Sequence, residues 1–113
     1  MRKVKKPWGS EDIWAITDKY LGKILTINPG HRLSLQYHQK KDETVYVLEG
    51  KLIIWFSKNE NDKVTYNPGT TYHIEPGKIH RFGAPEGDTP TRIIEVSTPE
   101  IDDVIRLEDD YKR

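Results

Sequence analysis

Four polar side chains in three short segments of the chain have the types and the spacing to bind a metal ion. Successive side chains of an extended strand point to opposite faces, so Gln36 and His38 project from the same face of the segment that contains them. Glu43 starts the next apolar segment and shares one strand face with the valines that follow it. His80 comes shortly after a Pro-Gly turn and supplies a second imidazole.

A carboxylate at the start of an apolar strand face needs a partner, because burying it unpaired costs several kcal/mol. A cation held between Glu43, imidazole nitrogens and the amide oxygen of Gln36 would offset that cost. Such a set of nitrogen and oxygen ligands suits Zn, Fe, Mn, Ni or Co, and we expect one divalent ion, with Zn first among them. The alternative is a hydrogen-bonded polar cluster in the core, without a metal.

The elements that carry these residues are predicted to be strands. Runs rich in β-branched and aromatic residues alternate with short clusters of Gly, Pro, Asn and Asp, which is typical of an all-β sandwich or barrel. No repeat or linker interrupts them. The predicted strands cover residues 13–17, 20–27, 33–38, 44–48, 51–57, 63–66, 71–75, 80–82 and 91–97.

Length and charge limit the functions open to the chain. The 113 residues predict one domain, 1–113, with a short N-terminal arm and an acidic C-terminal tail. The tail could be a single helical turn, an exposed extended arm or a disordered segment. Over the whole chain, 18 basic and 18 acidic side chains balance, so we expect no nucleic acid and no membrane as partner. Without Cys, disulfides and thiolate metal sites are excluded.

The first residues are basic, but Pro7-Trp8-Gly9 follows them where a signal peptide would continue with an apolar stretch. No run of apolar residues is long enough to predict a transmembrane helix. We therefore expect a cytoplasmic location.

The spacing of the candidate ligands resembles the two sequence motifs of the cupin superfamily. For the first, Gly30 is followed after five residues by Gln36-Tyr37-His38, after four more by Glu43 and after six more by Gly50. Only the first His of that motif is changed, to Gln36. For the second, the positions of Gly69, Gly77 and His80 match, while Pro76 stands one position late and Ala84 replaces an Asn. The resemblance implies a jelly-roll barrel, the cupin double-stranded β-helix.

Nearly the whole chain resembles one branch of the cupins, the isomerase domain of type II mannose-6-phosphate isomerases. The matching segments are Pro7-Trp8-Gly9, the strand ending in Gln36-Tyr37-His38, His80-Arg81 and the terminal Glu108-Asp109-Asp110-Tyr111. The sugar-phosphate isomerase cupins share the Gln substitution. The resemblance implies a metal-dependent aldose–ketose interconversion through an enediol, with a sugar phosphate as substrate. No glycine-rich phosphate loop is present, so we expect no nucleotidyltransferase activity.

Four further residues are candidates for catalysis or substrate binding. A base must move the proton between adjacent carbons, and His73 and Lys41 are the candidates for catalytic roles. Lys23 and Arg81 are candidates for binding the phosphate. Each could instead be a solvated or hydrogen-bonded structural side chain. At Lys41 and Thr44 the resembled family has Arg and His, and Lys lacks the bidentate fork of Arg.

Two other functions remain open on the sequence. One is a non-catalytic cupin that binds a sugar or a sugar nucleotide, and the other is a small Fe(II) cupin dioxygenase. We also expect a homodimer, because cupins commonly pair through their sheet edges.

Overall fold

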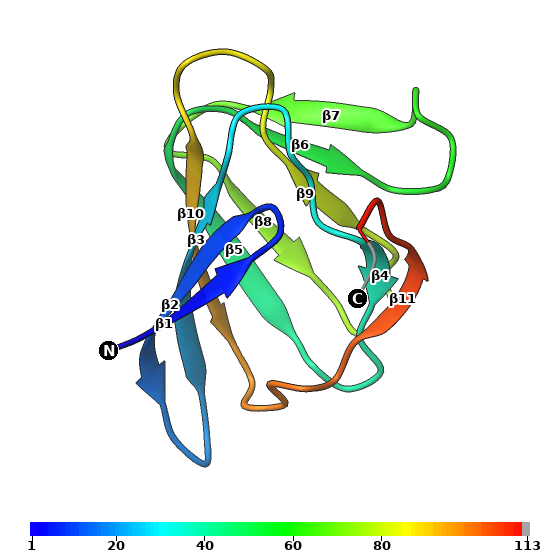
Figure 1. The fold of residues 1–113 in the computed structure, drawn as a ribbon. Coiled ribbons are helices and arrows are strands. Elements are labelled where there is room, and N and C mark those ends of the chain that lie inside the picture. The colour runs from blue at the N-terminus through cyan, green and yellow to red at the C-terminus, as the bar shows by residue number, and fades with distance from the viewer. Residues whose placement is uncertain (112–113) are drawn as a thin grey trace.

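The computed structural model describes residues 1–111, which form strands connected by turns and loops, with antiparallel pairing between neighbouring strands (Figure 1). Within these residues no helix has the length and hydropathy needed to cross a bilayer. The strands are β1 (Arg2–Lys6), β2 (Gly9–Ile16), β3 (Leu21–Ile27), β4 (Leu35–Tyr37), β5 (Glu43–Glu49), β6 (Leu52–Trp55), β7 (Lys63–Tyr66), β8 (Thr71–Ile74), β9 (Arg81–Gly83), β10 (Thr91–Ser97) and β11 (Ile105–Glu108).

The strands form two opposing layers. One is a six-stranded sheet in the order β1-β2-β3-β10-β5-β8. The other combines the sheet β7-β6-β9 with the pair β11-β4, and bridges between Arg32 and Gly83 and between Gln36 and His80 join these two parts. The layers curve around a shared interior, as the ribbon shows (Figure 1). This is the double-stranded β-helix that the resemblance implies.

Alternation of side chains decides which face of each strand is buried. In β10 the buried residues are Thr91, Ile93, Glu95 and Ser97, and the residues between them are less buried. The apolar members of such faces pack into one core that includes Leu25, Val45, Val47, Phe82 and Ile93. Charged members of the same faces, among them Lys23, Glu43 and Glu95, are also buried, so the interior is partly polar.

Three turns of the form X-Pro-Gly-X connect strands and explain three glycines. Gly30, Gly69 and Gly77 have φ of 76°, 89° and 85°, a left-handed conformation in which a Cβ would be strained. In each turn the residue after Gly donates its N–H to the carbonyl of the residue before Pro, as His31 does to Asn28 at 3.0 Å. The last of these turns leads directly to His80.

The nine predicted strands are confirmed as elements, although several bounds differ. β2 begins at Gly9, four residues before the predicted start, and β4 is limited to three residues. Two strands were not predicted, β1 and β11, which lie in the supposed N-terminal arm and C-terminal tail. Both are short and rich in charged residues, so they carry little local β-propensity, and their pairing partners decide their conformation.

Up to Tyr111, the C-terminal tail contains a paired strand. The expected extended conformation is confirmed, although the tail is attached to the barrel, and the expectations of a helical turn and of disorder are wrong. β11 pairs with β4, far away in the chain. The guanidinium of Arg81 donates to the carboxylates of Glu108 at 2.7 Å and Asp110 at 3.3 Å. Asp110 also accepts a hydrogen bond from Arg32 Nε at 2.6 Å. The tail therefore covers one side of the barrel.

Asp103, just before β11, holds the loop between β4 and β5. Its carboxylate accepts hydrogen bonds from the backbone N–H groups of Gln39, Lys40 and Lys41 at 3.0, 2.7 and 2.9 Å. Its backbone carbonyl accepts a bond from the Nδ1 of His38 at 2.6 Å. The tail thus fixes both the loop and one of the candidate ligands.

We predict that Asp103→Asn lowers the free energy of unfolding by about 1 kcal/mol at neutral pH, because an amide satisfies fewer of the three backbone donors. The three donors, led by Lys40, lower the pKa of Asp103 below its usual 3.8. The carboxylate therefore contributes stability above about pH 4, and this contribution falls as pH drops through the lowered pKa.

Urea unfolding of the unchanged protein and of Asp103→Asn between pH 7 and pH 3 checks this. The difference in their free energies of unfolding should decrease towards pH 3. The matched control is Asp102→Asn, one residue away on an exposed side chain, which should match the unchanged protein. A gap that is constant with pH would contradict the assigned role of the carboxylate.

Candidate metal centre

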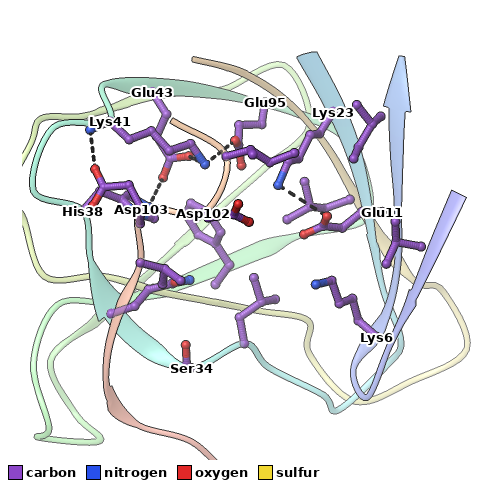
Figure 2. A pocket seen from close by; sticks show the side chains of 18 of the residues that line it. Lys6, Glu11, Lys23, Ser34, His38, Lys41, Glu43, Glu95, Asp102 and Asp103 are labelled. Carbon is purple, nitrogen blue, oxygen red and sulfur yellow. Dashed lines mark hydrogen bonds and ion pairs between the residues drawn. The ribbon is translucent and has the colours of Figure 1, made fainter. Parts of the chain in front are cut away.

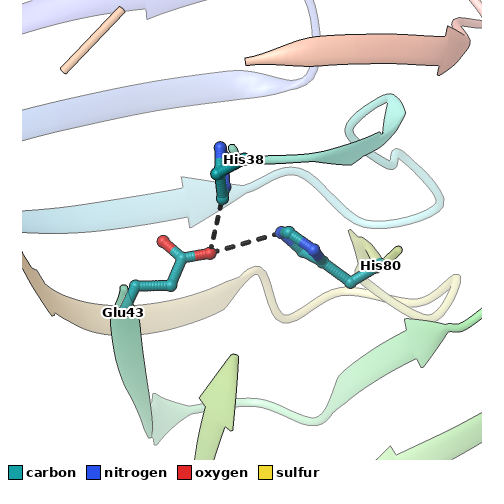
Figure 3. Close-up of side chains that lie close together, drawn as sticks. All are labelled: His38, Glu43 and His80. Atoms are coloured by element: carbon teal, nitrogen blue, oxygen red, sulfur yellow. Dashed lines mark ion pairs between the residues drawn. The ribbon is translucent and has the colours of Figure 1, made fainter. Parts of the chain in front are cut away.

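His38, Glu43 and His80 converge inside the barrel from three separate places in the chain (Figure 3). His38 follows β4, Glu43 is the first residue of β5 and His80 immediately precedes β9. The Nε2 atoms of His38 and His80 lie 3.3 and 3.2 Å from the same carboxylate oxygen, Oε1 of Glu43. All three side chains are buried, with exposed fractions of 5%, 2% and 0% for His38, Glu43 and His80.

Backbone pairing between distant segments brings these residues together. Gln36 and His80 face each other in an antiparallel bridge, and their backbones exchange hydrogen bonds of 3.0 and 2.9 Å. Residues directly opposite in such a bridge project to the same side, so Gln36 and His80 share the inner face. His38, two residues after Gln36, lies on that face too. The X-Pro-Gly turn before His80 is held by Gly77, whose N–H donates to the His38 carbonyl at 2.6 Å.

In each His, the hydrogen bond made by Nδ1 determines whether Nε2 carries a proton or a lone pair. Nδ1 of His38 lies 2.6 Å from the carbonyl oxygen of Asp103, and Nδ1 of His80 lies 2.9 Å from that of Lys78. A carbonyl oxygen only accepts, so each Nδ1 carries a proton. In the neutral imidazole this leaves a lone pair on each Nε2, directed at Glu43. Backbone carbonyls orient metal-binding His residues in proteins in the same way.

The donor set fits a cation. Two nitrogen lone pairs and a carboxylate oxygen that face one another at 3.2 to 3.3 Å repel, unless protons or a cation lie among them. His80 Nε2 and both carboxylate oxygens of Glu43 are buried and make no hydrogen bond of good geometry within residues 1–111. Two imidazoles and a carboxylate are a donor set that Zn and other first-row divalent ions accept.

Electrostatics keep Glu43 ionised. Burial alone would raise the pKa of the Glu43 carboxyl, but His38 and His80, which donate to it when their rings are protonated, and the charge of Lys41 outweigh burial and hold that pKa well below its usual range. A buried, ionised carboxylate beside two imidazoles is the form that a metal ligand requires.

A buried ion pair adjoins the cluster. Lys41 Nζ lies 2.7 Å from Oε2 of Glu95 and 3.4 Å from Oε2 of Glu43. Burial lowers the pKa of the Lys41 ammonium, but the two carboxylates outweigh this and raise it above the usual value, so the amine is charged. Burial and the nearby charge of Glu43 raise the pKa of Glu95 to about 7, against the opposing effect of Lys41. The predicted residue Lys41 therefore does lie at the site, as a permanent cation.

Lys23 also lies inside the barrel. It is buried on β3, directly opposite Glu95 of β10 in the sheet register, and its Nζ lies 3.3 Å from Oε2 of Glu11 on β2. Lys23, Glu95 and Glu11 thus form a polar row across three strands, continuing from Lys41 (Figure 2). The assignment of Lys23 to phosphate binding stays a prediction.

One cavity of about 370 Å³ is lined by this polar row and by His38, Lys41 and Glu43, whereas the fully buried His80 is not among its lining residues. That volume lies within the range of roughly 300–1,000 Å³ typical of small-molecule sites. Polar and charged side chains dominate its lining, with a few apolar ones between them (Figure 2). Gln36 is among the lining residues, beside His38, so its amide is available to the site, and its role as a ligand stays a prediction.

Besides His80, two predicted site residues do not line this cavity, Arg81 and His73. Arg81 is buried, but its guanidinium donates to the Leu33 carbonyl at 2.7 Å and to the carboxylates of the tail. Strand parity turns it away from the side chain of His80, its neighbour in the chain. His73 is exposed on the edge strand β8, where its Nε2 lies 2.6 Å from Oδ1 of Asp42. Neither geometry supports a contact with a substrate in the cavity, and we assign both residues structural roles.

Sequence reasoning missed several residues of the site. Glu95 and Glu11 each stand in a strand at the parity of buried apolar residues, and this alternation was a usable signal. Asp103 had no comparable signal, because its role depends on contacts with a loop more than 60 residues away in the chain, as the separations of 62 to 64 show.

Comparison with known proteins agrees with the motifs. Residues 1–109 match the family model described as the C-terminal domain of mannose-6-phosphate isomerase. The xanthan biosynthesis protein XanB of Xanthomonas campestris pv. campestris is 32% identical, over 99% of this chain and 24% of its own length. Mannose-1-phosphate guanylyltransferase ManC of Salmonella typhimurium is 34% identical, over 99% of this chain and 23% of its own. The chain therefore spans about a quarter of the length of these relatives.

A solved structure of an uncharacterised protein from Klebsiella pneumoniae with a double-stranded β-helix domain superposes with a TM-score of 0.74. It is 15% identical, and the match covers 95% of this chain and 85% of that one. At this identity the similarity supports the fold alone.

We predict that the purified protein retains about one divalent ion per chain and that His80→Gln weakens metal affinity at least tenfold, since it removes one of few ligands. Metal analysis by mass spectrometry after dialysis measures both. His73→Gln is the matched control, because it changes the same residue type outside the cavity, and it should retain the ion. Equal metal content in the two variants, each folded by circular dichroism, would rule out the centre as described.

Proposed function

The chain belongs to the mannose-6-phosphate isomerase C-terminal family, and we propose from this membership and from the site that it is a metal-dependent sugar-phosphate isomerase. The proposed reaction interconverts an aldose phosphate and a ketose phosphate through an enediol. One observation carries the proposal: His38, Glu43 and His80 cluster, and two of them, His38 and Glu43, line a cavity together with the buried pair of Lys41 and Glu95.

A divalent ion held by His38, Glu43 and His80 would supply Lewis-acid polarisation of the substrate carbonyl. Lys41 contributes a fixed positive charge beside the ligands. Its ammonium is held by Glu95 and Glu43 and needs no reorganisation when negative charge develops on an enediolate oxygen, which favours the transition state. The barrel limits access of water to this end of the cavity, since the three ligands are almost completely buried.

Proton transfer between the two carbons requires a group that can both accept and donate a proton. We assign this role to Glu95, which lines the cavity and is 2.7 Å from Lys41. This replaces His73, which lies outside the cavity, and it leaves Lys41 as an electrostatic residue. An ammonium with a raised pKa is a poor base, which agrees with that division of roles.

A second candidate function is a cupin that binds a sugar without converting it. The ion pair of Lys41 favours it, because a charge that is neutralised by Glu95 and Glu43 leaves less field to stabilise an enediolate. In both functions the sugar occupies the same cavity, so turnover distinguishes them.

We predict that the metal-loaded protein converts mannose 6-phosphate to fructose 6-phosphate, that chelation abolishes this activity and that added Zn²⁺ restores it. Lys41→Met should lower kcat at least tenfold, since the loss of one stabilising group typically costs a factor of 10² or more. Formation of fructose 6-phosphate in a coupled assay is the measurement.

His73→Gln serves as the control and should keep its kcat. Activity that is indifferent to chelation would refute the proposed mechanism. Tight binding of mannose 6-phosphate by the metal-loaded protein, without turnover, would favour the second candidate function.

A further inference from the structure

Basic side chains gather on the side of the cavity formed by β1 and β3. Arg2 and Lys6 reach it from β1, and Lys23 reaches it from β3. In the close-up, Lys6 extends into the cavity on the same side as Lys23 and Glu11, while His38, Lys41 and Glu43 lie at the opposite side (Figure 2). We call Arg2, Lys6 and Lys23 the basic wall. Arg106 lines the same cavity from β11.

Strand parity sorts the basic residues of β1 into two sets. Arg2 and Lys6 line the cavity together with Val4 between them, whereas Lys3 and Lys5 do not. Lys3 has a partner outside the cavity, the carboxylate of Asp12 at 3.3 Å. Lys6 is half-buried and Lys5 is exposed. The strand therefore presents a cation to the cavity at alternate positions.

The basic wall carries positive charge that the described residues do not neutralise. Within residues 1–111, no carboxylate oxygen lies within 4.0 Å of the charged nitrogens of Arg2, Lys6 or Arg106, and of the wall only Lys23 has such a partner, Glu11 at 3.3 Å. The two lysines that are almost fully buried, Lys23 and Lys41, are both paired.

Lys6 therefore stands out, because it is partly withdrawn from solvent and faces a cavity without a counter-ion. Such a position favours an anion. Asp102 and Asp103 line the cavity as well, but Asp103 is engaged by three backbone N–H groups of another loop.

We propose that the basic wall is an anion site for the phosphate monoester of the sugar, with Lys6 as its principal contact and Lys23, which Glu11 pairs, beside it. The inference rests on the proposed function and deepens it, because it fixes the direction in which the substrate lies. The phosphate is held at β1 and β3, and the carbonyl end reaches His38 and Glu43, which line the opposite side of the cavity. Lysine ammonium groups bind phosphate as point charges, and two of them on neighbouring parts of one wall suit a dianion.

Binding by isothermal titration calorimetry tests the site, with mannose 6-phosphate, mannose and inorganic phosphate as probes of the metal-loaded protein. We expect the unchanged protein to bind mannose 6-phosphate at least tenfold more tightly than mannose, and inorganic phosphate to compete with it. Lys6→Gln should weaken mannose 6-phosphate binding about tenfold and leave mannose binding unchanged, because one charge-assisted contact is lost. Lys6→Arg should restore most of the affinity.

The matched control is Lys5→Gln, which removes the same charge from the same strand on the other face and should change the affinity less than twofold. Equal affinity of Lys6→Gln and the unchanged protein for mannose 6-phosphate would overturn the proposal. So would equal binding of mannose and mannose 6-phosphate, or no binding of mannose 6-phosphate, by the unchanged protein. Circular dichroism of each variant verifies that it is folded.

The test separates this inference from the proposed reaction. If the expected binding pattern is found without isomerase activity, the anion site stands and the isomerase proposal fails. If mannose 6-phosphate is converted and Lys6→Gln leaves KM unchanged, the isomerase proposal stands and the anion site fails. An effect of Lys6→Gln on KM for the phosphorylated sugar, with kcat preserved, supports both.

Discussion

The buried, ionised carboxylate of Glu43 is the constraint on which the rest of the site depends. A charge that is 2% exposed is tolerated only when opposite charge surrounds it. Lys41 supplies positive charge 3.4 Å from the carboxylate, and His38 and His80 face it with Nε2 at 3.3 and 3.2 Å, where a bound cation would complete the balance. Lys41 in turn needs Glu95, and Glu95 faces Lys23 across the sheet. One buried anion thus accounts for a sequence of alternating charges inside an otherwise apolar fold.

Such a network is costly for stability, because each charge has lost its hydration and regains only part of that free energy from its partners. A hydrophobic interior would serve the fold at least as well. The presence of the charged network therefore points to chemistry or binding as the reason that these residues lie inside the barrel. The interior agrees, since the cavity adjoins the apolar core and shares Trp8, Leu25, Leu33 and Phe82 with it, while its other lining residues are mostly polar.

The C-terminal segment is part of the site, although it contributes no ligand. The Asp103 carbonyl orients the His38 ring, and the Asp103 carboxylate fixes the backbone of Lys41. β11 then pairs with β4, next to Gln36, and Arg81 anchors the acidic end of the chain. Through these contacts the C-terminal segment holds the candidate ligand His38 and the neighbouring Lys41 in place.

The sequence by itself determined the strands with regular alternation, the X-Pro-Gly turns and the candidate ligands His38, Glu43 and His80, because these depend on strand parity and on short spacings. Lys41 and Lys23 were also identified before the structure, although their ion pairs were not. Only the tertiary structure decided that β1 and β11 are strands, that Glu95 and Asp103 belong to the site and that His73 and Arg81 lie outside the cavity. The physical reason is that these outcomes depend on pairing between segments far apart in the chain, and local propensity carries no information on which distant backbone or carboxylate a residue will meet.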